Sequence, residues 1–198
     1  MKYICQLDYE NIKYVTRTDL TGEDKLKGEN TTIRSSGCGL CSSIMVVDRL
    51  LVDYKFDLED AIKLSYSAKA NYTYGTSLKR LGPKLAEKFN LEYEESSDSE
   101  RLVYCLQTGG AVIANVGGDR EGHIGVFSHG GHYIAVIGIE KDGRLAILDP
   151  SYKEGKYLEE GRVGKVELKN GVIALCDVQT LKEDTANRTP SYYLFWRK

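Results

Sequence analysis

The sequence lacks the features that would place it in a specialised class of protein. Only three of its 198 residues are prolines, and only three are histidines. No apolar run approaches the roughly 18 to 20 residues that a membrane-spanning helix needs. The 27 Lys and Arg residues against 29 Asp and Glu give a formal net charge of −2, which attracts neither nucleic acid nor an anionic membrane. We therefore expect neither of these among the partners.

Cysteine is scarce as well, and its five positions are odd in number and scattered along the chain. This disfavours a disulfide framework and leaves at least one thiol unpaired. The first residues contain no uninterrupted apolar signal region, so the chain as given predicts a cytoplasmic protein, or a secreted one if a signal peptide has been removed. The globular composition, with 41% hydrophobic residues, predicts one folded domain over residues 1–198.

Two halves of different composition follow a polar segment, residues 1–36, that we expect to be an extended arm on the surface. Apolar periodicity predicts helices at 41–51, 58–68, 78–89 and 97–107, the second capped by Asp57 and the third divided at Gly82-Pro83. β-Branched and aromatic runs predict strands at 111–116, 132–139, 145–148, 171–175 and 192–196. Helices followed by antiparallel strands indicate an α+β domain, in which a helical N-terminal half packs on an antiparallel sheet.

Cys38 is the sharpest candidate for a functional residue, because glycines flank it directly before the first buried helix. A thiol at a helix N-terminus feels unpaired backbone N–H groups and the positive end of the helix dipole, and both lower its pKa. The glycines leave room for a substrate carbonyl, and the Cys38 N–H can help to hold an oxyanion. The other interpretation is a buried structural cysteine in a glycine-rich turn.

A thiol nucleophile needs a base, and His132 opens one of the predicted strands. The Asp142-Gly143 turn predicts an antiparallel hairpin that brings Asp149, at the end of the next strand, back to the same edge as His132. Cys38 as nucleophile, His132 as base and Asp149 as the group that orients the ring form the arrangement used in acyl transfer.

The residues around these three positions resemble a known family. The similar stretches are Ser-Gly-Cys-Gly at 36–39, Ala-Val-Ile-Ala-Asn-Val at 111–116, Gly-Gly-His-Tyr-Ile-Ala-Val-Ile-Gly at 130–138 and Leu-Asp-Pro at 148–150. Together they resemble a papain-like cysteine peptidase of the bacterial bacteriocin-processing, double-glycine peptidase type. The resemblance implies a papain-like α+β fold, a peptide or amide substrate, and the triad roles for Cys38, His132 and Asp149. It requires no cofactor and no metal.

Two positions depart from the family pattern. Many members read Cys-Gly-Pro at the nucleophile, whereas this chain reads Cys38-Gly39-Leu40-Cys41. Members also place a glutamine upstream to complete the oxyanion hole. Gln6 has the right chemistry at a distance of 32 residues and is favoured; Arg17 is the alternative. The Gly-Gly leader substrate of the transporter-fused members is not carried over.

Three other functions stay open. Cys38 and Cys41 form a Cys-x-x-Cys pair at a helix start, which is typical of thiol–disulfide redox proteins. The same two cysteines with His129 and His132 would make a four-ligand zinc set. A papain-like domain with a weak oxyanion hole would act as a peptide-binding module without turnover. His123 and His129 are otherwise expected to be loop residues, exposed to solvent or lining a substrate groove.

Overall fold

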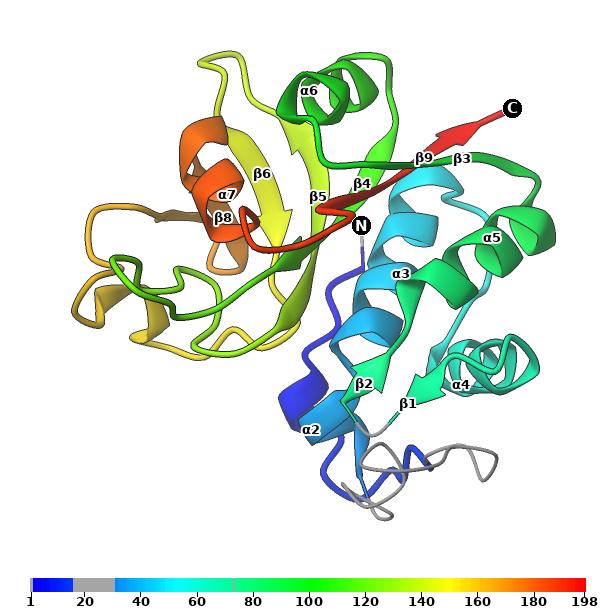
Figure 1. The fold of residues 1–198 in the computed structure, drawn as a ribbon. Coiled ribbons are helices and arrows are strands. Elements are labelled where there is room, and N and C mark those ends of the chain that lie inside the picture. The colour runs from blue at the N-terminus through cyan, green and yellow to red at the C-terminus, as the bar shows by residue number, and fades with distance from the viewer. Residues whose placement is uncertain (1, 16–30, 73) are drawn as a thin grey trace.

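A computed structural model describes residues 2–15, 31–72 and 74–198, and within them a seven-stranded sheet forms the centre of the fold (Figure 1). All neighbouring strands run antiparallel. In spatial order the strands are β3 (Leu91–Ser96), β9 (Tyr192–Arg197), β4 (Ala111–Val116), β5 (His132–Ile139), β6 (Leu145–Leu148), β8 (Ile173–Cys176) and β7 (Glu167–Lys169). The mixed α+β class is therefore confirmed.

Helices cover both faces of this sheet. On one face lie α3 (Cys38–Leu50), α4 (Leu58–Ser67) and α5 (Leu78–Phe89), and on the other lie α6 (Ser99–Gln107) and α7 (Val178–Asp184) (Figure 1). Alternate residues of a strand face opposite sides, so Ile113 of β4 belongs to the α3 core and Val112 to the α6 core. Two buried faces explain why the central strands are continuous apolar runs.

Most of the predicted elements are present, with small shifts at their ends. The predicted strands at 111–116, 132–139 and 145–148 match β4, β5 and β6, and the hairpin at Asp142-Gly143 is confirmed. Asp57 caps α4 by accepting a hydrogen bond from the backbone N–H of Asp60. The pattern did not reveal β3, β7, α7 or the short strands β1 (Asn71–Tyr72) and β2 (Gly75–Thr76).

The predicted break at Gly82-Pro83 is wrong, because α5 continues through both residues to Phe89. Proline removes one N–H donor from the helix ladder, a loss that the packing of this amphipathic helix outweighs. Gly82 serves a different purpose: a Cβ atom there would lie 2.6 Å from the Tyr93 ring on β3. The glycine allows helix and strand to approach, and Asn90, in the left-handed conformation, ends the helix.

The N-terminal segment packs more deeply than an extended surface arm. Ile4 and Tyr14 are buried in the core, and the Tyr14 hydroxyl hydrogen-bonds Ser65 and Thr76. The segment also contains the 3-10 turn η1 (Gln6–Asp8) and the short helix α2 (Ile33–Ser36). Arg17, the alternative oxyanion residue, lies outside the described residues.

No helix among the described residues is both long enough and apolar enough to cross a lipid bilayer.

Candidate active site

Cys38 is the first residue of α3 and is partly exposed. Gly37 allows α2 and α3 to follow each other directly, since a Cβ atom at Gly37 would lie 2.6 Å from the Ile33 side chain and carbonyl oxygen. Gly39 faces Thr76 and Leu78 just as closely. The backbone groups of Gly39 and Tyr133 lie near the sulfur and lower the pKa of the thiol. The sequence thus places the thiol at an open helix N-terminus, as expected.

His132 is the first residue of β5 and is buried. Its Nε2 lies 2.9 Å from Oδ1 of Asp149, the residue that follows β6. The ring also interacts with the Cys38 thiol, and Nδ1 is the nitrogen that the bond to Asp149 leaves available for it. The Ser42 hydroxyl, one turn after Cys38, donates to the Tyr133 carbonyl at 3.1 Å and so ties α3 to β5 beside the histidine.

Cys38, His132 and Asp149 shift one another's pKa values. Burial alone would raise the pKa of the Cys38 thiol, but the His132 hydrogen bond and charge and the two backbone N–H groups lower it below its ordinary value. Burial opposes protonation of His132, yet its bonds to Asp149 and Cys38 raise its pKa to about 9. Both shifts favour the thiolate and the imidazolium over the neutral pair.

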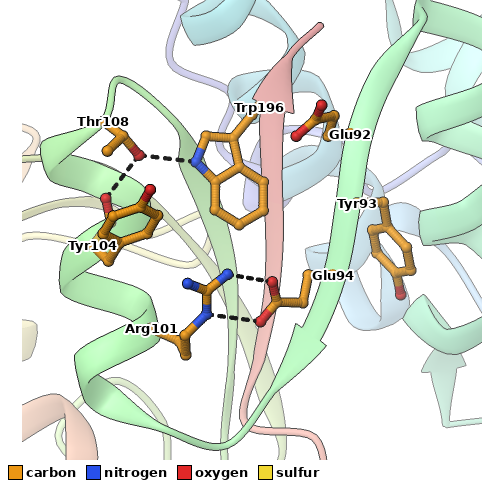
Figure 2. Close-up of a pocket in the computed structure, with 7 residues that line it drawn as sticks. All are labelled: Glu92, Tyr93, Glu94, Arg101, Tyr104, Thr108 and Trp196. Carbon is orange, nitrogen blue, oxygen red and sulfur yellow. Dashed lines mark hydrogen bonds and ion pairs between the residues drawn. The ribbon is translucent and has the colours of Figure 1, made fainter.

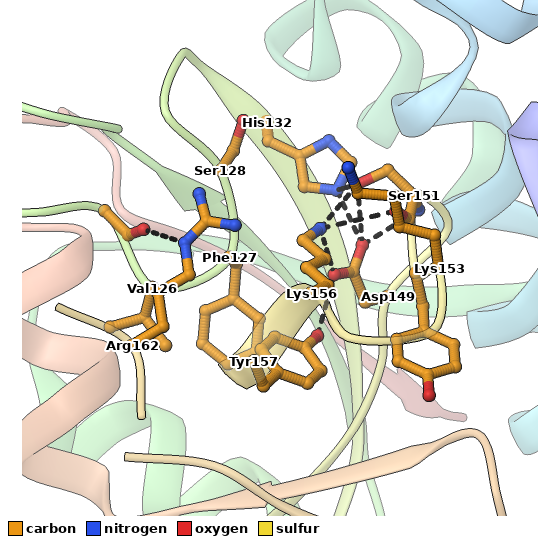
Figure 3. Close-up of polar contacts among 12 residues, drawn as sticks. Val126, Phe127, Ser128, His132, Asp149, Ser151, Lys153, Lys156, Tyr157 and Arg162 are labelled. Carbon is orange, nitrogen blue, oxygen red and sulfur yellow. Dashed lines mark hydrogen bonds and ion pairs between the residues drawn. The ribbon is translucent and has the colours of Figure 1, made fainter. Parts of the chain in front are cut away.

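Asp149 is fully buried and accepts hydrogen bonds on both oxygens (Figure 3). Besides His132, Oδ1 accepts from the backbone N–H of Ser151 at 2.8 Å and from its hydroxyl at 3.0 Å. Oδ2 accepts from Lys156 Nζ at 2.5 Å and from the Tyr157 hydroxyl at 2.7 Å. Burial raises the pKa of the Asp149 carboxyl, but His132 and Lys156 hold it well below its usual range. The carboxylate stays ionised.

Sequence reasoning missed Ser151, Lys156 and Tyr157, which complete this network. Ser151 comes two residues after Asp149, and its hydroxyl lies 3.0 Å from His132 Nε2. Lys156 and Tyr157 lie in the short turn η2 (Lys156–Leu158) and are both buried. The only available signal was their nearness to Asp149 in a segment whose Lys, Glu and Gly residues otherwise indicate solvent exposure.

Gln6 is buried beside the segment that carries Asp149. Its backbone N–H donates to the Pro150 carbonyl at 2.7 Å, and its side-chain Nε2 donates to the Arg34 carbonyl in α2, also at 2.7 Å. Its Oε1 is buried without a hydrogen-bond partner. Among the bonds of the described residues none joins Gln6 to Cys38, although the second N–H of its amide is still available for another acceptor.

Cys41 and His129, which the redox and zinc hypotheses require, have other surroundings. Cys41 is fully buried, and burial together with the nearby Cys38 and Cys5 sulfurs raises its pKa. His129 is mostly exposed and binds Asp119 through Nδ1 at 2.8 Å. In the part of the chain that the structure describes, no three His, Cys, Asp or Glu side chains are grouped to hold a metal ion.

His123 is not a free loop residue. Its Nε2 lies 2.8 Å from Oδ1 of Asp184, a buried carboxylate that also accepts from the backbone N–H groups of Val126 and Phe127. These bonds fasten the segment before His132 to α7. We therefore assign His123 a structural role.

A separate hollow lies between α6 and the β3–β9 edge of the sheet (Figure 2). Its Arg101 binds Glu94 through two nitrogens and lies over the rings of Tyr104 and Trp196. These contacts occupy the guanidinium, and the residues of the Cys38 site come from other elements. The hollow therefore adds nothing to that site.

Comparison with known proteins leaves the function to be argued from the site itself. The chain matches no protein-family model, and no curated protein is significantly similar to it.

Proposed function

We propose that this protein is a cysteine peptidase, or a related thiol-dependent acyl hydrolase, acting on a peptide or amide substrate through Cys38, His132 and Asp149. One observation carries the proposal: His132 is held by the buried Asp149 carboxylate at 2.9 Å, and the same ring interacts with the Cys38 thiol and lowers its pKa. The three groups come from a helix start and from the two strands of one hairpin, which agrees with a papain-like arrangement of the α+β domain.

The chemistry follows from the charge distribution. The Cys38 thiolate attacks the substrate carbonyl carbon, and the carbonyl oxygen becomes an oxyanion facing the N–H groups at the start of α3. The His132 imidazolium gives its Nδ1 proton to the leaving amine as the C–N bond breaks, which leaves a thioester on Cys38. Neutral His132 then takes a proton from water, the resulting hydroxide attacks the thioester, and the acid product leaves while thiolate and imidazolium are restored. No cofactor enters these steps.

Gln6 is the residue that we propose as a second oxyanion donor, through the amide N–H that does not bind Arg34. If it acts in this way, Gln6→Leu should lower turnover by about 10²- to 10³-fold, the usual effect of losing such a donor. Alkylation of Cys38 should be unaffected, since that reaction develops no oxyanion. Equal turnover in Gln6→Leu and wild type would exclude this role.

A second candidate function is a peptide-binding module without turnover. The observation that favours it is the engagement of the Gln6 amide with the Arg34 carbonyl. A papain-like site whose glutamine is held in this way would still be able to bind peptide and would carry a reactive thiol.

The test uses the whole chain and a peptide vinyl sulfone, an electrophile that forms a stable adduct with an activated thiol. Mass spectrometry should find the adduct on Cys38 near neutral pH, and Cys38→Ala should abolish both the adduct and hydrolysis of a peptide library. Cys5→Ala is the matched control at a partly exposed thiol in the N-terminal segment. Labelling without hydrolysis of any library member would favour the binding module, and hydrolysis by Cys38→Ala would overturn the proposal.

A further inference from the structure

Lys156 is a buried lysine that contacts Asp149 of the candidate triad (Figure 3). Its Nζ lies 2.5 Å from Asp149 Oδ2 and 2.7 Å from the Ser151 hydroxyl, and 3.5 Å from the Ser151 carbonyl oxygen. A lysine is almost never fully buried without a partner, because removing its charge from water is unfavourable. Here its partner is the carboxylate that orients His132.

We propose that Lys156 is a positioning residue for the proton transfer by His132: its ammonium fixes the Asp149 carboxylate and offsets part of the pull of that carboxylate on the imidazolium. This inference rests on the proposed function of the Cys38 site. The hydrogen bonds support it, since His132 takes one oxygen of Asp149 and Lys156 takes the other.

Two opposing requirements explain why such a charge is useful. Asp149 must stay ionised to hold the ring of His132, but a buried unshared carboxylate would bind the imidazolium proton too tightly for transfer to a leaving amine. A second cation on the same carboxylate satisfies both requirements. It stabilises the ionised form of Asp149, and it weakens the attraction between that carboxylate and the His132 proton. Lys156 also holds the Ser151 hydroxyl, which touches both Nε2 of His132 and Oδ1 of Asp149.

The other titratable groups around the pair are Cys38 from α3, Tyr157 beside Lys156, and Tyr3 from the N-terminal segment, whose hydroxyl donates to the Asp149 carbonyl. Burial raises the pKa of both phenols above its ordinary value, so both stay neutral where His132 titrates. Among the described residues that contact Asp149, Lys156 is thus the cation that accompanies His132.

The test compares Lys156→Met with Lys156→Arg and with Lys153→Met in the full chain. Lys153 is the matched control, because it lies three residues away, is mostly exposed and faces Glu159 at 3.8 Å. Two readouts need no substrate. One is the NMR titration of the three histidine rings, assigned with single His→Gln variants; the other is the rate of Cys38 alkylation by iodoacetamide as a function of pH.

Loss of the cation should make His132 hold its proton more tightly. In Lys156→Met we expect the midpoint of the His132 titration to move up by about one pH unit, at the lower end of the usual effect of a neighbouring charge. The inflection of the alkylation profile at the higher pH, which reports the same loss of the His132 proton, should move by the same amount. Lys156→Arg should restore the wild-type midpoint, and Lys153→Met should leave it unchanged. A role confined to folding would lower stability without moving the midpoint.

Lys156→Gln provides a second uncharged variant that keeps hydrogen-bonding capacity, in case Lys156→Met does not fold. An unmoved His132 midpoint in either folded variant would overturn the inference, as would an equal shift in Lys153→Met. The proposed function fails in a different way: wild-type Cys38 would show no alkylation below the ordinary pKa of a thiol, and no variant would be needed to see it.

Discussion

Asp149→Asn should be strongly destabilising, because it leaves the Lys156 ammonium buried without an anion and with only neutral oxygens as acceptors. Breaking a buried ion pair by removing one partner typically costs about 3–5 kcal/mol. The substitution also removes the negative charge that faces the His132 imidazolium. We therefore expect the free energy of unfolding to fall by about 3–5 kcal/mol.

Lys156→Met should cost less, about 1–3 kcal/mol, although it breaks the same ion pair. The Asp149 carboxylate would keep His132, the Tyr157 hydroxyl and two bonds from Ser151. The Asp149 carboxylate would then lack only the Lys156 donor, and the free energy lost is that of one hydrogen-bond partner of a buried group. The double variant Asp149→Asn/Lys156→Met should be more stable than the sum of the two losses predicts, by about 1–3 kcal/mol, because no unpaired charge remains.

This double-mutant cycle is measured by urea unfolding of the wild type, the two single variants and the double variant. Asp142→Asn is the control. Asp142 pairs with Arg144 at 2.8 Å on the surface, where water and salt screen an ion pair so that it contributes little to stability. The reasoning about burial would be refuted by an Asp149→Asn loss no larger than that of Asp142→Asn, or by a strictly additive double variant.

The loss in Asp149→Asn should also depend on pH. The pKa of Asp149 is lowered in the folded protein, so its contribution is present above the unfolded value of about 3.9 and disappears as the pH falls through the folded value. The pKa of His132 is raised, so its contribution is present below about 6.5 and disappears as the pH rises through about 9. The difference from wild type should therefore be largest between about pH 4 and 6.5.

Three further predictions follow from single contacts. Cys41→Ala should leave selective iodoacetamide labelling of Cys38 intact; its loss would favour a redox role for the pair. Gly82→Ala should destabilise the protein by about 1–3 kcal/mol in thermal unfolding, because the new methyl overlaps the Tyr93 ring by more than helix propensity can offset, and a stabilised variant would contradict this. Asp184→Asn should lower stability by about 1–3 kcal/mol and speed hydrogen exchange at the two loop N–H groups that it accepts from, whereas unchanged exchange would exclude that anchoring role.

The sequence predicts the centre of the fold better than its edges. β4, β5 and β6 are apolar on both faces and bounded by Gly and Asp, so their type and limits are visible in the residues. β3 and β7 lie at the two edges of the sheet. β3 reads Leu-Glu-Tyr-Glu-Glu-Ser, and its three glutamates hide the strand pattern. β7 reads Glu-Leu-Lys and is exposed throughout, so it has no buried face that the sequence could reveal. The break expected in α5 is wrong because packing against β3 overrides the local preference of Gly82-Pro83.

The sequence also predicts some residues of the candidate site and misses others. His132 and Asp149 belong to one hairpin, so their proximity follows from a turn signal and strand alternation. Lys156 could not be found, because its burial depends on the η2 turn folding back onto a carboxylate that also needs a cation. A lysine in a segment rich in Lys, Glu and Gly indicates a solvated loop in any single sequence.

The distance between nucleophile and base depends on tertiary structure alone, and this makes it the most informative feature of the site. Cys38 and His132 are brought together by the packing of α3 on β5, where the Ser42 hydroxyl donates to the Tyr133 carbonyl. A one-residue change in strand register would turn His132 to the opposite face of the sheet. The same packing also places a carboxylate, a hydroxyl and a buried cation behind the ring, and core formation alone does not call for them, because apolar side chains of similar volume would stabilise the fold as well. Under the proposed function, this network would control proton transfer at Cys38.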